Sequence, residues 1–324
     1  MTETLPKVAI IGAGLAGLTL AGRLGVRAQV KLFEKSRGLG GRMATRYAGA
    51  YEFDHGAQYF TIETAAFDAF LDPYKASGLI AAWPEEVAAL GGARVSSRTK
   101  YVAAPRMNQL CKTLGADLDI TVQTRIERLV RAGDTWTLIS DAGEAHAGFD
   151  WVISAAPAPQ SQAVLPDDFA GQAMLAKTRM TGCFSVMLGF AEPVALPFVF
   201  AKCAGGPVGV IAVNAAKPGR DTACSILLQS TNEWAETHME DDLDDVAAGL
   251  IRAASELSGV ELGRADHRAV HRWRFAATPE PAGAPFLLDA AQSLAACGDW
   301  CGAGKVEAAF TSAASLADAL AQRL

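Results

Sequence analysis

The chain of 324 residues is 50% hydrophobic and 20% charged, which predicts about two domains with a real core and excludes a disordered, collagen-like or disulfide-framework protein. Its longest uncharged stretch, Trp151–Pro166, has 16 residues and three prolines, so we expect no membrane-spanning helix, which needs about 20 apolar residues. A net charge of −6 without a basic stripe argues against nucleic-acid binding.

The first elements predicted along the chain are a strand, a glycine-rich loop and a helix. The apolar run Val8–Ile11 is typical of a buried parallel strand, and it leads into the pattern Gly12-x-Gly14-x-x-Gly17. Gly12 permits a tight turn, Gly14 lets the backbone approach a pyrophosphate, and Gly17 allows close packing of the helix on the strand. The helix N-terminus would favour phosphate. We expect all residues of the loop to contact the bound cofactor: Gly12, Ala13, Gly14, Leu15, Ala16 and Gly17.

An acidic residue stands at the distance that a dinucleotide site requires. The second predicted strand, Gln29–Phe33, ends at Glu34, which lies 20 residues after Gly14. A carboxylate there accepts hydrogen bonds from ribose hydroxyls and repels a 2′-phosphate. Together with the strand and the helix, this spacing favours a dinucleotide site over a plain glycine-rich turn.

A second glycine pair follows the acidic residue. Gly40 and Gly41 are flanked by arginines, a pattern that a simple dehydrogenase does not need. Adjacent glycines let the backbone approach a ligand, and Arg42 can reach phosphate. The pattern resembles the second motif of the FAD-dependent amine oxidase superfamily, the alternative being a flexible basic surface loop. The resemblance implies FAD as the cofactor, with contacts from Lys35, Gly41, Arg42 and Met43.

The middle of the chain alternates between elements. We expect a helix over 105–114, strands over 120–129, 135–140 and 146–153, and a turn at 141–143. Ile126 falls where this superfamily usually has an apolar contact to adenine.

Beyond Pro159 the pattern changes to apolar, β-branched runs. Strands are predicted over 183–190, 208–213, 224–229 and 267–275. The acidic run Glu240–Asp245 precedes a helical pattern, and acids in a first turn complement the helix dipole, a metal site being the alternative. These elements predict an antiparallel sheet capped by helices.

The C-terminal segment repeats the order strand, turn and helix. Leu294–Cys297 is a predicted strand, and Asp299 precedes a glycine-rich turn and an amphipathic helix that starts at Val306. In flavoproteins of this type such a segment returns to the first domain, where its aspartate binds the ribityl or pyrophosphate region. The resemblance implies cofactor contacts from Asp299, Lys305 and Val306, and a Trp300 ring over the flavin.

The predicted fold class is therefore α/β. We expect a Rossmann-like FAD-binding domain of the amine-oxidase type, with an inserted α+β substrate domain built on an antiparallel sheet. The FAD-binding domain would comprise residues 1–75, 100–158 and 290–324, and the substrate domain residues 76–99 and 159–289.

Four blocks narrow the resemblance. They resemble the renalase-like flavoproteins, especially the bacterial members, and are Glu34–Arg46, Phe53–Phe60, His271–Phe275 and Gly298–Trp300. The block Phe53-Asp-His-Gly-Ala-Gln-Tyr-Phe60 is distinctive, and the resemblance covers nearly the whole chain. The sequence departs from the family at Phe275, where tyrosine is expected, and at Thr231-Asn232; both departures concern substrate detail.

This resemblance implies an oxidase of the 2- and 6-dihydro isomers of NAD(P)H. A hydride would pass to non-covalently bound FAD, NAD(P)+ would leave, and O2 would be reduced to hydrogen peroxide. The sequence has one dinucleotide fingerprint, so the dihydronicotinamide dinucleotide would enter the substrate cavity itself. Because the cofactor carries the chemistry, we expect no nucleophile–base set.

Candidate residues for catalytic contact stand in three of the chain's segments. A histidine or glutamine can hydrogen-bond a ligand, and a tryptophan can stack on nicotinamide. The candidates are His55, Gln58, Asn214, Trp273 and Arg274, of which Asn214 would bind a carboxamide. His55, Gly56, Ala57 and Gln58 are also expected to contact the cofactor. Each polar or aromatic candidate has the alternative of being a satisfied core residue.

Other functions remain open at this point. A true amine oxidase would have an aromatic cage around its monoamine or polyamine substrate. A desaturase or oxidase of apolar substrates, and a non-enzymatic binding module on the same fold, are further alternatives.

The N-terminus and the cysteines indicate a reducing compartment. No basic segment with a cleavage site stands at the N-terminus, so we expect no signal peptide. The six cysteines form no CxxC pair and no zinc-spaced Cys/His cluster, which predicts free thiols and no metal site. Cys297 and Cys301 are more simply buried thiols than a redox pair or a covalent flavin link. We expect a cytoplasmic protein.

Overall fold

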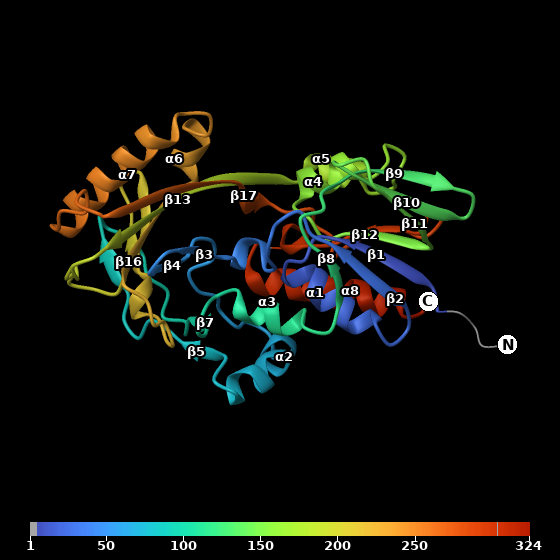
Figure 1. Cartoon of the computed structure of the whole chain (residues 1–324), viewed down its shortest axis with the longest axis horizontal. Coiled ribbons are helices and arrows are strands. Elements are labelled where there is room, and N and C mark those ends of the chain that lie inside the picture. The colour runs from blue at the N-terminus through green and yellow to red at the C-terminus, as the bar shows by residue number, and fades with distance from the viewer. Residues whose placement is uncertain (1–4, 303) are drawn as a thin grey trace. The chain divides into compact units, whose positions relative to one another are not determined.

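The computed structural model describes residues 5–302 and 304–324 (Figure 1). Contacts divide the chain into two compact units, each built from separate stretches of sequence. Unit 1 comprises Met1–Gly41, Cys111–Met180 and Thr278–Leu324, and unit 2 comprises Arg42–Leu110 and Thr181–Ala277.

Unit 1 contains a six-stranded sheet in the order β18-β19-β12-β1-β2-β8. Neighbours from β19 to β8 are parallel, and the edge strand β18 is antiparallel to β19. Residues Val8–Ile11 of the central strand are buried, which confirms the predicted parallel strand. The strands are β1 (Lys7–Ile11), β2 (Gln29–Phe33), β8 (Asp119–Thr121), β12 (Trp151–Ser154), β18 (Leu287–Asp289) and β19 (Leu294–Ala296).

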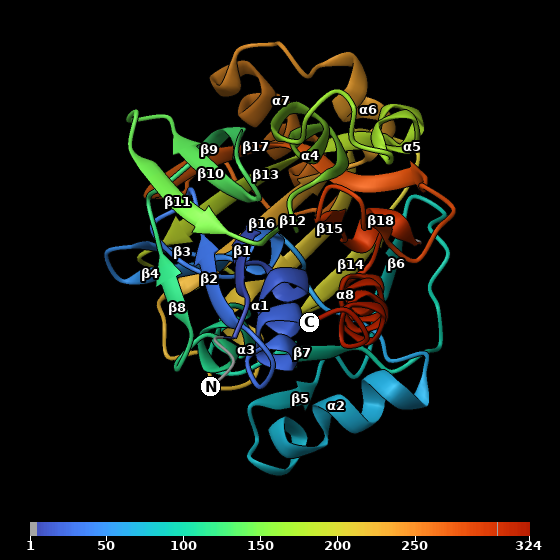
Figure 2. The same ribbon diagram turned by 90° about the vertical axis from the view of Figure 1, so that its right-hand side faces the viewer.

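Helices α1 (Leu15–Leu24) and α8 (Val306–Leu320) pack against each other, and α1 also contacts β1 and β2 (Figure 2). Large side chains fill the core of the unit, among them Phe33, Trp136, Phe169 and Trp300. Smaller elements complete it. They are an antiparallel sheet of β9 (Ile126–Ala132), β10 (Thr135–Ser140) and β11 (Ala145–Phe149), helices α4 (Ala158–Val164) and α5 (Gln172–Lys177), and the 3-10 turn η3 (Asp299–Cys301).

Unit 2 is built on a second six-stranded sheet in the order β17-β13-β16-β15-β14-β6. Strands β13, β16, β15 and β14 are antiparallel neighbours, whereas β6 runs parallel to β14. The predicted antiparallel sheet is therefore present, with one parallel edge strand. Its strands are β6 (Ala88–Leu90), β13 (Arg179–Phe190), β14 (Phe200–Cys203), β15 (Val208–Val213), β16 (Cys224–Ser230) and β17 (His267–Glu280).

Helix α7 (Leu243–Ser258) packs against β15 and β16. The carboxylate of Asp242 accepts hydrogen bonds from the backbone N of Asp244 and of Asp245, at 2.8 and 3.3 Å. The acidic run therefore begins the helix, as predicted. The remaining elements are η1 (Gly41–Met43), β3 (Thr45–Ala48), β4 (Tyr51–Asp54), α2 (Ala65–Ala76), β5 (Ile80–Ala82), β7 (Tyr101–Ala103), α3 (Gln109–Leu114), η2 (Asn214–Ala216) and α6 (Asn232–Thr237).

Several predicted elements have other bounds in the structure. Residues 120–129 form parts of two strands in different sheets, because Gln123 between them has φ of 55°. Residues 146–153 likewise belong to β11 and β12. The helix expected over 105–114 begins only at Gln109, since the backbone N–H of Met107 bonds to the carboxylate of Asp54.

The units divide the chain at other positions than the predicted domains. Residues 42–75 and 100–110 belong to unit 2, and residues 159–180 and 278–289 belong to unit 1. Packing explains this, because β4 contacts β16, and Val164, Phe169, Leu175 and Leu287 belong to the core of unit 1. In the described ranges, none of the helices is both long and apolar enough to cross a membrane.

Two glycines of α1 make a matched test of its packing. A Cβ at Gly17 would lie 2.0 Å from the carbonyl oxygen of Gly12, whereas one at Gly22 meets no described atom within 4 Å. We expect Gly17→Ala to lower the free energy of unfolding by about 1–3 kcal/mol, as overpacking does. Gly22→Ala should raise it by about 0.5–1 kcal/mol, because alanine is the better helix former. Urea denaturation measures both, and equal effects would contradict this packing.

Candidate functional site

The first glycine-rich loop joins β1 to α1. Gly12 has φ of +107°, and Gly17 has no room for a side chain against Gly12, so both positions require glycine. Gly14 differs, because a Cβ there would have the Gly40 carbonyl oxygen, 4.0 Å away, as its one close neighbour among the described residues. The backbone at Gly14 therefore faces space that a ligand can fill.

Glu34 reaches this loop from the end of β2. Its Oε2 accepts a hydrogen bond from Ala13 N at 2.9 Å, and its Oε1 accepts one from Ser36 N at 2.8 Å. The side chain is buried, and each oxygen has a further lone pair for a ligand hydroxyl. The spacing of Gly14 and Glu34 thus brings the carboxylate to the loop, as predicted.

The second glycine pair lies directly against the first loop. Gly40 N donates to Ala13 O at 3.0 Å, and Gly40 forms an isolated parallel bridge with Gly14. Gly41 has φ of +53°, and a Cβ built on it would lie 3.7 Å from Gly14 Cα. These residues form a glycine cradle, which we define as Gly12, Gly14, Gly40, Gly41 and the carboxylate of Glu34. A flexible surface loop is therefore the wrong interpretation of Gly40-Gly41.

The C-terminal segment adds a turn and a helix start to unit 1. The carbonyl oxygen of Asp299 accepts hydrogen bonds from Gly302 N and Gly304 N at 3.0 and 3.1 Å, and α8 begins directly after Lys305. Gly304 has φ of +67°, and a Cβ on it would lie 3.1 Å from Oγ1 of Thr278. That hydroxyl is buried and has no hydrogen-bond partner among residues 5–302 and 304–324. No sequence pattern indicated Thr278.

The ring of Trp300 does not have the predicted place. It is 0% exposed, belongs to the core of unit 1, and donates a hydrogen bond from Nε1 to Ala156 O at 2.9 Å. A ring without accessible surface cannot stack on a flavin. The alternative of a satisfied core tryptophan is therefore correct for this side chain.

The other residues predicted to bind cofactor fall in both units. Ile126 begins β9 and is buried in the core cluster beside Phe33. Burial and the Arg125 guanidinium lower the pKa of Lys35, whose Nζ donates to Gln160 Oε1 at 3.1 Å. Unit 1 holds Gly12, Ala13, Gly14, Leu15, Ala16, Gly17, Glu34, Lys35, Gly41, Ile126, Asp299, Trp300, Lys305 and Val306. Unit 2 holds Arg42, Met43, His55, Gly56, Ala57 and Gln58.

Three aromatic side chains meet in unit 2. His55 follows β4, and its ring stacks on Trp273 with centroids 5.1 Å apart and contacts His271 edge-on at 5.0 Å. Trp273 and His271 are alternate residues of β17, and their rings are 4.2 Å apart. We name His55, His271 and Trp273 the aromatic trio. His271 was not among the predicted contacts, although its spacing of two residues from Trp273 in a strand places both on one face.

Both histidines of the trio are uncharged at neutral pH. Burial, the neighbouring His271 and the Arg46 guanidinium lower the pKa of His55 to about 4, against opposing effects of the Phe53 backbone and Asp54. Burial and Arg46 also lower the pKa of His271. Nδ1 of His55 is buried and has no hydrogen-bond partner in the described part of the chain. The trio is thus a cluster of uncharged rings, in which His55 stacks on Trp273 and His271 stands edge-on to both.

Two predicted contacts instead hold the backbone near His55. Gln58 donates from Nε2 to Asp54 O at 2.5 Å and to Gly56 O at 2.9 Å. Asn214 is fully buried, donates from Nδ2 to Glu52 O at 2.8 Å, and accepts from Asp54 N at its Oδ1 at 3.2 Å. Because Asn214 is 0% exposed and its amide binds the backbone, the carboxamide contact predicted for it is wrong.

Arg274 lies away from the trio. It forms an ion pair with Glu240, in which Nη2 and Oε2 are 3.0 Å apart, and both side chains are exposed. Successive residues of a strand point to opposite faces, so Arg274 cannot share the face of Trp273. The strand also continues to Glu280, whereas we expected it to end near these residues.

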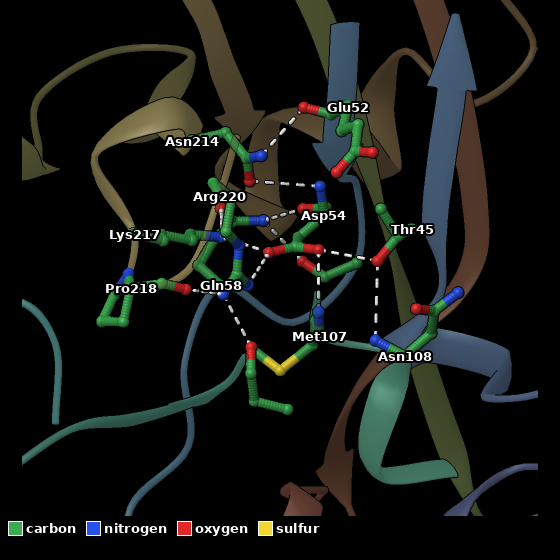
Figure 3. A network of polar contacts seen from close by, with 12 residues as sticks. Thr45, Glu52, Asp54, Gln58, Met107, Asn108, Asn214, Lys217, Pro218 and Arg220 are labelled. Carbon is green, nitrogen blue, oxygen red and sulfur yellow. Dashed lines mark hydrogen bonds and ion pairs between the residues drawn. The ribbon is translucent and has the colours of Figure 1, made fainter. Parts of the chain in front are cut away.

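A buried ion network around Asp54 was missed by the sequence analysis. Its Oδ2 binds Lys217 Nζ at 3.1 Å and Arg220 Nη2 at 2.6 Å, and its Oδ1 accepts from Thr45 Oγ1 at 2.7 Å and Met107 N at 3.0 Å (Figure 3). Burial opposes ionisation, but the two cations hold the pKa of Asp54 below its usual range. Lys217 lies 163 residues from Asp54, a separation that no local pattern reveals.

The thiols and carboxylates of the described residues form no further centre. All six cysteines are free, and burial raises the pKa of Cys301 to about 11, so this thiol is not a thiolate at neutral pH. In the part of the chain that the structure describes, no group of three or more His, Cys, Asp or Glu side chains could hold a metal ion.

Comparison with known proteins agrees with the predicted fold. Residues 10–73 match the family described as NAD(P)-binding Rossmann-like domain. The whole chain is similar to a putative protoporphyrinogen oxidase from Exiguobacterium sp. 255-15, with a TM-score of 0.78, 12% identity and 100% of each chain covered. It is also similar to putrescine oxidase bound to putrescine, with a TM-score of 0.70, 11% identity, and 98% of this chain and 99% of that chain covered. A putrescine oxidase variant made in a redesign of cofactor binding gives a TM-score of 0.72 at 12% identity, over 99% of this chain and 100% of that chain. The predicted fold, a Rossmann-like domain with α/β sheets, is confirmed.

The neutral state of His55 predicts a pH dependence of stability. A histidine whose pKa is 6.5 unfolded and about 4 folded binds fewer protons when folded, so stability falls as the pH drops from 6.5 to 4. The contribution is about 3 kcal/mol over that interval. His55→Gln should lose this part of the pH dependence, whereas His238→Gln, at the end of α6, should keep it. Denaturant unfolding at pH 7 and pH 4 measures the difference, and equal pH dependence in all three proteins would contradict it.

Proposed function

We propose that this protein is an FAD-dependent oxidase that converts the 2- and 6-dihydro isomers of NAD(P)H to NAD(P)+. The observation that carries the proposal is the glycine cradle in unit 1, with the carboxylate of Glu34 beside Ala13 N. When bound, FAD accepts the hydride from the substrate and passes the electrons to O2, which yields hydrogen peroxide.

The residues of unit 1 fit the successive parts of FAD. The first loop would hold the pyrophosphate at the N-terminus of α1, and Glu34 would accept hydrogen bonds from the adenosine ribose. Ile126 would contact the adenine, and Asp299 the ribityl chain. At the start of α8 we propose contacts from Lys305 and Val306. From unit 2, we propose further cofactor contacts from Arg42, Met43 and the segment 55–58.

The electrostatics of unit 2 favour a dihydronicotinamide over an amine. The trio is neutral and aromatic, which suits contact with an uncharged dihydropyridine ring. The charged groups that act on His55 include the Arg46 cation, and the Asp54 carboxylate is already neutralised by two cations. A positive neighbourhood attracts a dinucleotide pyrophosphate and repels an ammonium group.

Oxidation of an amine is the second candidate. It is supported by the similarity in fold to putrescine oxidase bound to putrescine. An aromatic surface such as the trio can also bind a cation through its ring faces.

The proposed cytoplasmic location is supported by the free cysteines, five of which are buried.

Anaerobic mixing separates the two candidates. We expect a 2- or 6-dihydronicotinamide dinucleotide to bleach the flavin absorbance rapidly and to leave as NAD(P)+, whereas monoamines and putrescine leave the flavin oxidised. Stopped-flow absorbance measures the bleaching, and NAD(P)+ is quantified after quenching. Bleaching by the amines alone would establish the second candidate and contradict the first.

A substitution tests the proposed role of Glu34. Glu34→Ala removes the acceptor for the ribose hydroxyls, and we expect FAD to bind about 10- to 100-fold more weakly, as for loss of a hydrogen bond to a charged group. Glu127→Ala removes an exposed carboxylate of β9 in the same unit and should leave the affinity unchanged. Flavin fluorescence during dialysis reports retention. Equal retention in both variants would count against the ribose contact.

A further inference from the structure

The Asp54 network holds more positive charge than its carboxylate neutralises. The side chains of Lys217 and Arg220 are 0% and 1% exposed, and both bind the same oxygen of Asp54. Arg220 alone would balance the carboxylate, so Lys217 brings a surplus buried cation, which is unfavourable for folding. Burial accordingly lowers the pKa of Lys217 to about 8, against the attraction of Asp54. A gain in folding stability therefore does not explain the presence of a lysine at position 217.

The second contact of Lys217 leads to Gln58. Its Nζ donates to Oε1 of Gln58 at 3.2 Å, while Nε2 of Gln58 donates to the carbonyl oxygens of Asp54 and Gly56. These two carbonyls flank His55 in the chain. An amide side chain has two orientations that exchange its oxygen and nitrogen. Because an ammonium group only donates and a carbonyl oxygen only accepts, Lys217 and the two carbonyls stabilise the same orientation, in which Nε2 faces the carbonyls.

Other side chains complete the support of the backbone at His55. The carbonyl oxygen of His55 accepts from Ser185 Oγ at 2.7 Å and from Trp273 Nε1 at 2.8 Å. Gly56 O also accepts from Gln229 Nε2 at 2.7 Å. The backbone of this segment is thus held at each carbonyl from Asp54 to Gly56, while the imidazole Nδ1 has no partner among the described residues. Such support fixes the direction in which a ring meets a ligand.

We propose that Lys217 is a positioning residue that orients the amide of Gln58 and, through it, the imidazole of His55 toward the substrate. The inference rests on the proposed function, in which His55 contacts the substrate. Lys217 itself is fully buried; it pairs with Asp54 and donates to Gln58, and we assign the positioning role to the contact with Gln58.

Lys217→Met tests the proposal in the full-length protein with FAD bound. Methionine keeps the length of the side chain and removes its donors, and Arg220 still pairs with Asp54. Lys100→Met is a matched control, since Lys100 is also buried, at 7% exposed, and donates to the carbonyls of Ser96 and Arg98. Each of the two lysines also lies over an aromatic ring, Lys100 over Tyr59 and Lys217 over Trp83.

The first readout is the titration of His55 by NMR, in which the five histidines are assigned with single variants. In Lys217→Met we expect the pKa of His55 to rise from about 4 toward 6.5, by about 1–2 pH units, because a ring that leaves its place regains water. In Lys100→Met it should stay at about 4. This measurement needs no substrate, so its result does not depend on the proposed oxidation.

The second readout compares activity with stability. We expect Lys217→Met to lower kcat/KM for the dihydronicotinamide substrate about 10- to 100-fold, as misplaced contacts do, with the melting temperature unchanged or higher. A lower melting temperature together with a wild-type titration of His55 would show a purely structural lysine and overturn the proposal.

Gln58→Leu reaches the same contact from its other end. We expect it to shift the His55 pKa as Lys217→Met does, and it serves in its place if that variant does not fold. The double variant should shift the pKa no further than Gln58→Leu alone, because the two residues act through one contact. A double variant whose shift is the sum of the single shifts would overturn the proposal.

Discussion

Helix α1 lies so close to the turn before it that a methyl group at Gly17 would overlap the carbonyl oxygen of Gly12. This contact sets the arrangement of unit 1. With α1 held against the end of β1, the backbone N–H of Ala13 meets the carboxylate of Glu34 at the end of β2, and the Ala13 carbonyl meets Gly40. The glycine cradle is thus a consequence of close helix packing, and its open position at Gly14 leaves room for a ligand near the Glu34 carboxylate.

A buried carboxylate organises each unit, but the two have different partners. Glu34 accepts hydrogen bonds from two backbone N–H groups, which position it while its remaining lone pairs can meet hydroxyl groups. Asp54 is surrounded by two cations, a hydroxyl and a backbone N–H, so all its capacity serves to join segments of unit 2. The carboxylate of Glu34 can therefore bind a ligand, whereas that of Asp54 holds segments of unit 2 together. The aromatic trio follows from this construction, because His55 is the next residue after Asp54.

The sequence allowed the fold and the cradle to be predicted because their signals are local. Residues 7–34 contain a strand, a glycine pattern, a helix and an acidic residue at fixed spacing. The acidic run that begins α7 is likewise a signal within a short stretch of sequence. Roles that depend on distant partners were harder to predict. Asn214 and Gln58 carry polar groups that suit a ligand, yet in the fold these groups bind the backbone around Asp54. The packing of Trp300 in the core, the ion pair of Arg274 with Glu240, and the contact of Lys217 with Asp54 all join residues with no common motif.

The central claim is that the glycine cradle of unit 1 holds FAD. The most direct measurement is the cofactor content of the purified full-length protein, released by denaturation and identified by chromatography and fluorescence. The account predicts a yellow protein that releases one FAD for each chain without proteolysis. A colourless protein that takes up no FAD on incubation with excess cofactor would contradict it.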